Sequence, residues 1–131
     1  MVSTASHREL AEAWLAEDPD PETAGELRAL LAACDASDAA AQKDLAERFT
    51  GALEFGTAGL RGVIGAGESR MNRAVVRRAT AGLARYLLAN VPDVKQRGVV
   101  VGRDGRRMSA EFADDTCGVL AAHGIPALYF T

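Results

Sequence analysis

The stretch Gly98-Val99-Val100-Val101-Gly102 decides the fold class of this chain. A short run of β-branched residues between glycines is typical of a buried strand in a parallel sheet. A helical segment follows, which we expect Ser109 to cap and Gly124 to end. A second apolar run comes next, Ile125-Pro126-Ala127-Leu128-Tyr129-Phe130. Strand, helix and strand within about thirty residues predict a βαβ unit with parallel strands and a right-handed crossover, and hence an α/β fold.

A long amphipathic helix is expected before this unit. Asn72 is its predicted N-cap, and it ends near Asn90 because Val91-Pro92-Asp93 interrupts the pattern. Apolar residues recur along it at spacings of three and four, which predicts one core-facing side. These residues are Val75, Ala79, Leu83, Tyr86 and Leu87.

Residues 1–50 are alanine-rich and carry signals for helix starts. Ser6-His7-Arg8-Glu9 and Thr23-Ala24-Gly25-Glu26 both fit capping boxes, and Asp18-Pro19-Asp20-Pro21 separates the two helices that they predict. A third helix is expected to begin near Asp38. The apolar stripes of all three are narrow. We therefore predict an N-terminal helical extension that packs on another part of the protein rather than a self-sufficient bundle.

Bulk composition restricts the class of protein. With 48% hydrophobic residues, 25% charged residues and a net charge of −3, the chain is typical of a soluble globular protein, and nothing favours nucleic acid or a membrane as its partner. We see no signal peptide and no run of membrane-spanning length, and we expect a cytoplasmic protein. Cys34 and Cys117 are isolated, so we expect two buried, reduced thiols and no metal site.

A glycine-rich stretch comes earlier in the chain, Leu53-Glu54-Phe55-Gly56-Thr57-Ala58-Gly59-Leu60-Arg61-Gly62. Glycines let backbone N–H groups approach a ligand closely, and arginine offers a planar fork of donors that suits phosphate. Arg61, Thr57 and Gly59 are therefore candidate contacts for an anionic ligand. An ordinary glycine-bearing hairpin explains the same letters equally well. No lysine stands where a P-loop needs one, and Gly65-Ala66-Gly67-Glu68-Ser69-Arg70 has arginine in place of the third glycine of a dinucleotide motif.

Two other groups of charged residues bear on this hypothesis. Asp104 and Arg106 follow the first apolar strand at its carboxyl end, where α/β sheets present functional groups. The simpler explanation is a turn in which Asp104 pairs with a neighbouring arginine; the alternative is that the two residues support Arg61 from behind. Arginines crowd the middle of the chain and could form a local basic patch, although Arg77 and Arg78 are expected to be solvated helix residues.

Three ordered segments resemble the phosphoglucomutase/phosphomannomutase family of sugar-phosphate mutases. They are Phe55 to Gly62, the segment Gly67-Glu68-Ser69-Arg70-Met71-Asn72-Arg73 with the helix after it, and Val99 to Arg106 with Ser109 beyond. The helices before them, with Trp14 and the Asp18-Pro19 turn, resemble the subgroup of phosphoglucomutase-2 and phosphopentomutase-like enzymes.

The resemblance implies a three-layer α/β/α domain with a mixed, largely parallel sheet over residues 51–131, after a helical extension over residues 1–50. It implies the first domain of an isomerase of carbohydrate metabolism, an intramolecular phosphotransferase. Such an enzyme interconverts the 1-phosphate and 6-phosphate of glucose or mannose through a phosphoserine and a bisphosphate. The arginine matching Arg61 lines the cleft near that phosphoserine, with Thr57 in the same loop. The implied partners are a phosphosugar and the remaining domains of the enzyme, and the implied cofactor is Mg²⁺.

The chain also departs from the family pattern. Thr4-Ala5-Ser6-His7 matches part of the phosphoserine loop, but Arg8-Glu9 replaces the Asn-Pro that should follow, and the stretch precedes the first helix. We assign no catalytic residue and no metal ligand to this chain, and expect it to be inactive by itself. The rival hypotheses are a non-catalytic phosphate-binding or protein-interaction module, and a piece of an unrelated doubly wound enzyme.

Overall fold

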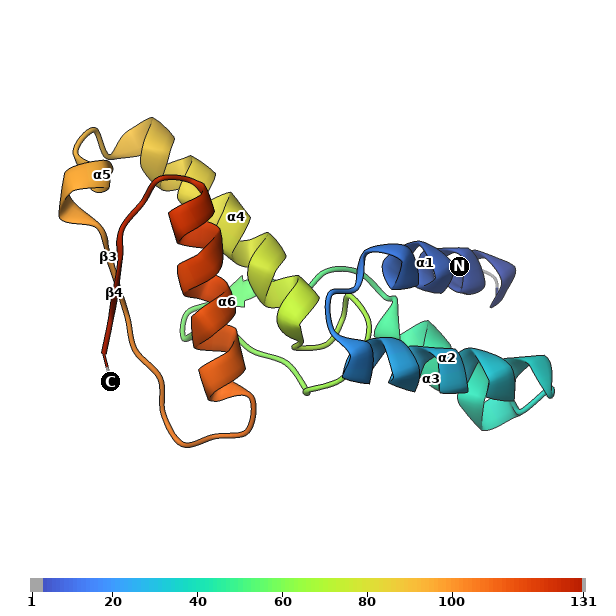
Figure 1. The fold of residues 1–131 in the computed structure, drawn as a ribbon. Coiled ribbons are helices and arrows are strands. Elements are labelled where there is room, and N and C mark those ends of the chain that lie inside the picture. Colours follow the sequence, from blue (N-terminus) through green and yellow to red (C-terminus); the bar gives the residue numbers. More distant parts are fainter. Residues whose placement is uncertain (1–3, 131) are drawn as a thin grey trace. The chain divides into compact units, whose positions relative to one another are not determined.

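The computed structural model describes residues 4–130, which fall into two compact units with a boundary after Ala74 (Figure 1). In chain order their elements are α1 (Thr4–Glu17), α2 (Pro21–Asp35), α3 (Ala39–Arg48), β1 (Phe55–Gly56), β2 (Gly59–Leu60), α4 (Arg73–Asn90), α5 (Val94–Arg97), β3 (Val99–Val101), α6 (Ser109–Ala122) and β4 (Ala127–Tyr129). Strands β1 and β2 pair antiparallel, whereas β3 and β4 pair in parallel. The α/β class is thus confirmed. The two pairs form separate sheets in the described residues, so the mixed sheet stays a prediction.

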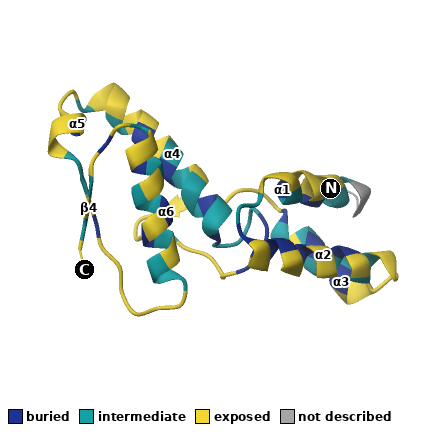
Figure 2. Cartoon of the chain, in the orientation of Figure 1, coloured by how far each residue is buried: buried dark blue, intermediate teal, exposed yellow. Residues whose placement is uncertain are grey.

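Helices α1, α2 and α3 of the first unit bury apolar side chains against one another. The rings of Trp14 and Phe49 meet edge to face with centroids 6.2 Å apart. Figure 2 shows dark blue, buried positions along these helices. The buried apolar residues here are Ala11, Trp14, Ala24, Leu27, Leu31, Ala41, Leu45 and Phe49. The three helices thus share buried apolar contacts with one another, and the prediction that they also pack on another part of the protein stays a prediction.

The predicted helix starts in this unit are partly confirmed. Asp38 caps α3, since its carboxylate accepts the N–H groups of Ala40 and Ala41. Helix α2, however, begins at Pro21 with Asp20 as its cap, and not at Thr23. Proline suits the first position of a helix, where no intrahelical partner for an N–H exists, so the residue expected only to interrupt helices also starts one. Helix α1 begins at Thr4, which places Ser6 inside the helix and not at its cap.

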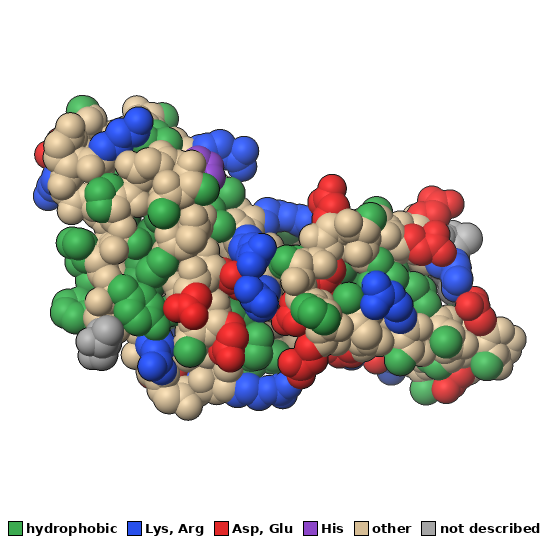
Figure 3. Space-filling view, in the orientation of Figure 1, with side chains coloured by type: hydrophobic (Ala, Val, Ile, Leu, Met, Phe, Trp, Pro, Cys, Tyr) green, Lys and Arg blue, Asp and Glu red, His purple; other side chains and the backbone are tan. Residues whose placement is uncertain are grey.

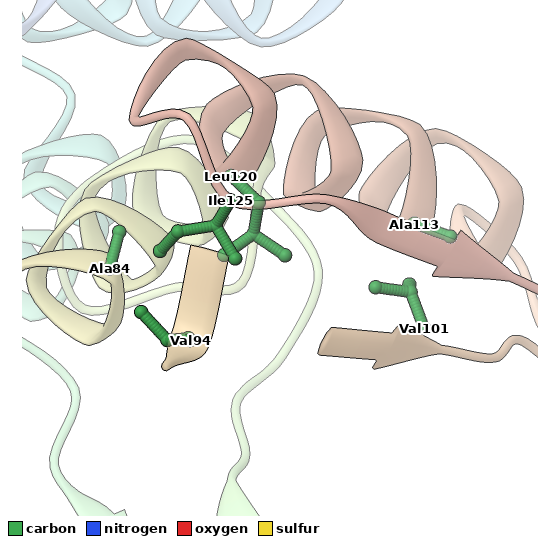
Figure 4. Packing of buried hydrophobic residues seen from close by; sticks show 6 residues of the cluster. All are labelled: Ala84, Val94, Val101, Ala113, Leu120 and Ile125. Carbon is green, nitrogen blue, oxygen red and sulfur yellow. The ribbon is translucent and has the colours of Figure 1, made fainter. Parts of the chain in front are cut away.

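The second unit contains the predicted βαβ arrangement. Helix α6 connects β3 to β4, and Val99 pairs with Ala127 in the parallel register. Figure 4 shows the apolar cluster, with side chains from α4, α5, α6, β3 and the segment before β4. Its buried members are Ala84, Val94, Val101, Ala113, Leu120 and Ile125. Helix α5, which the sequence analysis missed, contributes Val94 to this core.

Two predictions about buried faces in this unit were only partly confirmed, because Val101 of β3 and Val75 of α4 are buried but other expected residues are not. Val101 is buried, but Val100 is 58% exposed, so β3 has one covered face and one open face instead of being buried on both. Hydrophobic side chains gather over β3 and β4 in Figure 3. On α4 the expected core residues Leu83 and Tyr86 are exposed. Ala84 is buried in their place, because the core lies against the side of α4 that carries this small residue.

Of the two predictions about the ends of α6, one is confirmed and the other is wrong. Gly124 follows the helix with a φ of 75°, which confirms it as the terminating glycine. The N-cap position belongs to Met108, with a φ of 68°, and not to Ser109. The Ser109 hydroxyl instead accepts the backbone N–H of Asp104 at 3.1 Å, so it closes the loop before the helix.

Candidate functional site

The glycine-rich stretch of residues 53–62 folds as a β-hairpin in the first unit. Strand β1 pairs with β2 through Phe55–Leu60 and Gly56–Gly59, which leaves Thr57 and Ala58 as the two-residue turn. Gly59 has a φ of 95°, a backbone conformation that residues with a Cβ rarely adopt. Sequence alone thus left two interpretations of this stretch, and the local geometry is that of the hairpin.

The hairpin presents its polar groups to solvent. Thr57, Gly59 and Arg61 are all exposed, and Arg61 follows directly after β2. Within residues 4–130, no carboxylate forms an ion pair with the Arg61 guanidinium. A guanidinium without an internal counter-ion, beside a turn of exposed amides, is chemically suited to an incoming anion. The described residues bring Thr57, Gly59 and Arg61 together on one hairpin, but they do not enclose Arg61 in a cleft.

Asp104 and Arg106 lie in the second unit, in the loop between β3 and α6. The Asp104 carboxylate accepts hydrogen bonds from the Arg106 backbone at 3.0 Å and from its guanidinium at 2.7 Å. Together these hydrogen bonds lower the pKa of Asp104 from 3.8 to about 2. The bond from the Arg106 side chain is the largest cause, and the bond from its backbone is the next. These contacts match the simpler explanation, a turn stabilised by its own ion pair. Support of Arg61 by these residues stays a prediction, since Arg61 belongs to the other unit.

Arg77, which the sequence analysis expected to be solvated, has a specific partner in the second unit. The Arg77 guanidinium lies 2.8 Å from the carboxylate of Asp115, whose side chain is only 3% exposed. Arg77 is therefore not simply a solvated helix residue.

Cys34 and Cys117 are partly buried free thiols, less enclosed than expected, and burial raises the pKa of each.

Neither a metal centre nor a membrane span is found in the described residues. Between residues 4 and 130, no group of three or more His, Cys, Asp or Glu side chains could hold a metal ion. The same described residues contain no helix that is both long and apolar enough to cross a bilayer.

Sequence reasoning missed one charged cluster of the first unit. Arg48, at the end of α3, contacts Glu26, Asp44 and the backbone of Ala66. Its partners lie up to 22 residues away in sequence, so no local motif marks the cluster. The one local signal is the pair of glycines at 65 and 67, the second of which begins a segment that resembles the mutase family.

Residues 52–131, more than half of the chain, match the model of the phosphoglucomutase/phosphomannomutase α/β/α domain I. The chain belongs to the phosphoglucomutase/phosphomannomutase family. The family match covers the hairpin, the turn at residues 65–67 and the whole βαβ unit. It excludes the hypothesis of an unrelated doubly wound enzyme.

Curated relatives within this family include sugar-phosphate mutases of several kinds. A probable phosphoribomutase of Schizosaccharomyces pombe is 39% identical over 94% of this chain and 20% of its own length. A mouse phosphopentomutase is 36% identical over 90% of the chain and 19% of its own length. A phosphoglucomutase of Staphylococcus saprophyticus is 44% identical over 61% of the chain and 14% of its own length. The first two support the predicted subgroup, and no solved structure gives a significant match.

The chain therefore spans about a fifth of the length of the first two relatives. Their similarity also extends upstream of the family domain, because it covers nine tenths or more of this chain while the domain begins at residue 52. Helices α1, α2 and α3 thus lie in a region that phosphoribomutase-like and phosphopentomutase-like relatives share.

Proposed function

We propose that this chain supplies the first α/β domain of a phosphosugar mutase. The protein would shift phosphate between the C1 and C6 positions of glucose or mannose phosphate, through an enzyme phosphoserine and a sugar bisphosphate. Residues 51–131 would form the three-layer domain with its mixed sheet, and residues 1–50 the helical extension before it. The phosphoserine loop and the other domains would lie outside this chain, in a cytoplasmic protein.

One observation carries the proposal: the hairpin of the family domain presents Arg61 to solvent without an internal counter-ion in residues 4–130. Phosphoryl transfer depends mainly on positioning and on stabilising negative charge. Arg61 would bind a phosphate oxygen through its guanidinium, while Thr57 and the backbone near Gly59 would shape the approach. The family resemblance implies Mg²⁺ as well, but the described residues offer it no carboxylate cluster, and we assign it no step here.

A pentose phosphate is a second candidate substrate. Two phosphoribomutases and the mouse phosphopentomutase match 88–94% of the chain, and a phosphopentomutase of Pongo abelii matches 69%. The match to the bacterial phosphoglucomutase covers 61%, but that to a mouse glucose 1,6-bisphosphate synthase covers 90%. The names of the phosphoribomutase and phosphopentomutase relatives favour testing ribose phosphate beside the hexose phosphates. A non-catalytic phosphate-binding or protein-interaction module is the alternative if no sugar phosphate is converted.

The decisive experiment compares the longest protein that the reading frame encodes with the 131-residue chain. Both are assayed with the 1-phosphates of glucose, mannose and ribose. We expect conversion by the longer protein, and an Arg61→Ala variant should lose about two to four orders of magnitude in kcat/KM. Arg28→Ala removes an exposed arginine from α2 and is the matched control, with wild-type kinetics expected. Wild-type kinetics for Arg61→Ala would remove Arg61 from the site, and the absence of any conversion would favour the module.

A further inference from the structure

The turn formed by residues 65–67 is held against helices α2 and α3 by an ionic cluster. Arg48 donates from Nη1 to Oε1 of Glu26 at 2.5 Å and to the carbonyl oxygen of Ala66 at 3.2 Å. Glu26 accepts the backbone N–H of Ala66 through its other oxygen at 3.3 Å. Both backbone groups of Ala66 are therefore bonded to one arginine–glutamate pair. Ala66 itself is fully buried, so these polar groups have little access to water.

Arg48 is itself held rigidly. Its side chain is only 16% exposed, and its Nε donates to the carboxylate of Asp44 at 2.8 Å. One planar guanidinium thus serves Asp44, Glu26 and the Ala66 carbonyl at the same time, which a lysine ammonium on a flexible stem cannot reproduce. The segment after the turn also contacts the backbone of Arg48, because the Arg48 carbonyl oxygen accepts the N–H of Ser69 at 3.0 Å.

A second set of contacts connects this turn to the base of the hairpin. The side-chain amide of Asn72, 2% exposed, donates to the carbonyls of Gly65 and Gly67, both at 2.8 Å. The next residue back, Met71, accepts the N–H of Gly65 at 3.1 Å and donates to the carbonyl of Val63 at 2.8 Å. Val63 lies two residues after Arg61. A series of contacts thus runs from Arg48 to the segment that follows β2 of the hairpin.

From this geometry we infer that Arg48 is a positioning residue, which acts with Glu26 through the 65–67 turn to fix the base of the hairpin that presents Arg61. The effect of Arg48 on catalysis rests on the proposed function, whereas the effect of Arg48 on the hairpin does not. Arg48 contacts no ligand in this role; it limits the directions in which the Arg61 guanidinium can point.

Hydrogen exchange tests the structural step in this chain directly. In Arg48→Met, amides of residues 62–71 should exchange roughly tenfold faster, while amides in the middle of α2 keep their wild-type rates. Arg8→Met is the control: Arg8 also bonds two carboxylates, those of Glu12 and Asp35, but on an exposed face of α1. It should leave residues 62–71 unchanged. If Arg48→Met unfolds the first unit, Glu26→Gln keeps the acceptor oxygen without the charge and should give a smaller local increase.

Unchanged exchange at residues 62–71 in both the Arg48 and Glu26 variants would overturn the inference. So would an equal increase throughout α1, α2 and α3, because that result marks a general loss of stability and no specific effect on the turn.

A double-mutant cycle in the longer protein tests the catalytic consequence. Arg48→Met should lower kcat more than it raises KM, with a loss of roughly 5- to 50-fold in kcat/KM. In an Arg61→Ala background the same change should cost less than about twofold, since a positioning residue has nothing left to position. Equal losses in both backgrounds would assign Arg48 a merely structural role. If the wild-type protein converts no sugar phosphate, the proposed function fails, and the exchange experiment decides the inference alone.

Discussion

Two glycine-rich segments, separated by only two residues, have opposite environments in this protein. The hairpin stretch of residues 56–62 is almost entirely exposed, and a Cβ added at Gly56 would meet only the Gly59 carbonyl oxygen at an ordinary 3.8 Å. The turn of residues 65–67 is buried, and a Cβ at Gly67 would lie 2.8 Å from the Arg48 carbonyl oxygen. Glycine gives the first segment an open turn and lets the second approach another backbone. Glycine thus allows an exposed turn in the hairpin and close packing against the Arg48 backbone in the turn of residues 65–67.

The largest expected effect on stability comes from replacing the anchoring glycine. Gly67→Ala combines a φ of 111° with a close contact to backbone atoms that cannot move aside, and should lower the free energy of unfolding by about 3 kcal/mol. Gly56→Ala, without positive φ or close contact, should change it by less than about 0.5 kcal/mol. Urea denaturation of both variants measures the difference. Equal stabilities would contradict the difference in packing between the two segments.

A smaller effect is expected from the side chain that fastens the buried turn. Asn72→Ala leaves the Gly65 and Gly67 carbonyls without their amide donor and should cost about 2 kcal/mol. The control is Asn90→Ala, because Asn90 donates to the Tyr86 carbonyl in an exposed setting and should cost less than about 0.5 kcal/mol. Comparable losses in denaturation experiments would contradict the anchoring role of Asn72.

The smallest effect sharpens the contrast between two exposed arginines, of which Arg106 has a carboxylate partner and Arg61 has none in residues 4–130. Because its folded pKa of about 2 lies below its ordinary 3.8, Asp104 favours the folded state above about pH 4 and loses this contribution as the pH falls toward 2. An NMR titration should place the Asp104 midpoint near 2, and Arg106→Ala should raise it toward 3.8. Arg61→Ala should leave the Asp104 midpoint unchanged. A titration midpoint of Asp104 near 3.8 in the wild type would show that its ion pair with Arg106 does not form in solution.

Local chemistry allowed several features to be predicted correctly. The βαβ order followed from two short apolar runs around a helical segment, and α4 ends at Asn90 as expected. The cap at Asp38 and the glycine after α6 needed only short-range rules. Local patterns failed where two signals competed. Thr23 fitted a capping box, but its hydroxyl donates to Asp18, and Pro21 began the helix earlier.

The candidate site was predictable only in part. The Arg61 hairpin could be found because its glycines, threonine and arginine stand next to one another. The role of Arg48 could not, because its contacts with Glu26 and Ala66 span 22 and 18 residues of sequence. No periodicity or turn rule relates residues at such separations.

The sequence by itself determined the order of the helices and strands other than α5, the place of the glycine hairpin and the membership of the family. These features depend on neighbouring residues, whose backbone preferences and hydrophobic spacing act over a few positions. Only the tertiary structure decided which face of α4 and β3 is buried and which of the two glycine segments is anchored. Burial and long-range hydrogen bonds are properties of packed surfaces, and a linear pattern does not specify which surfaces meet.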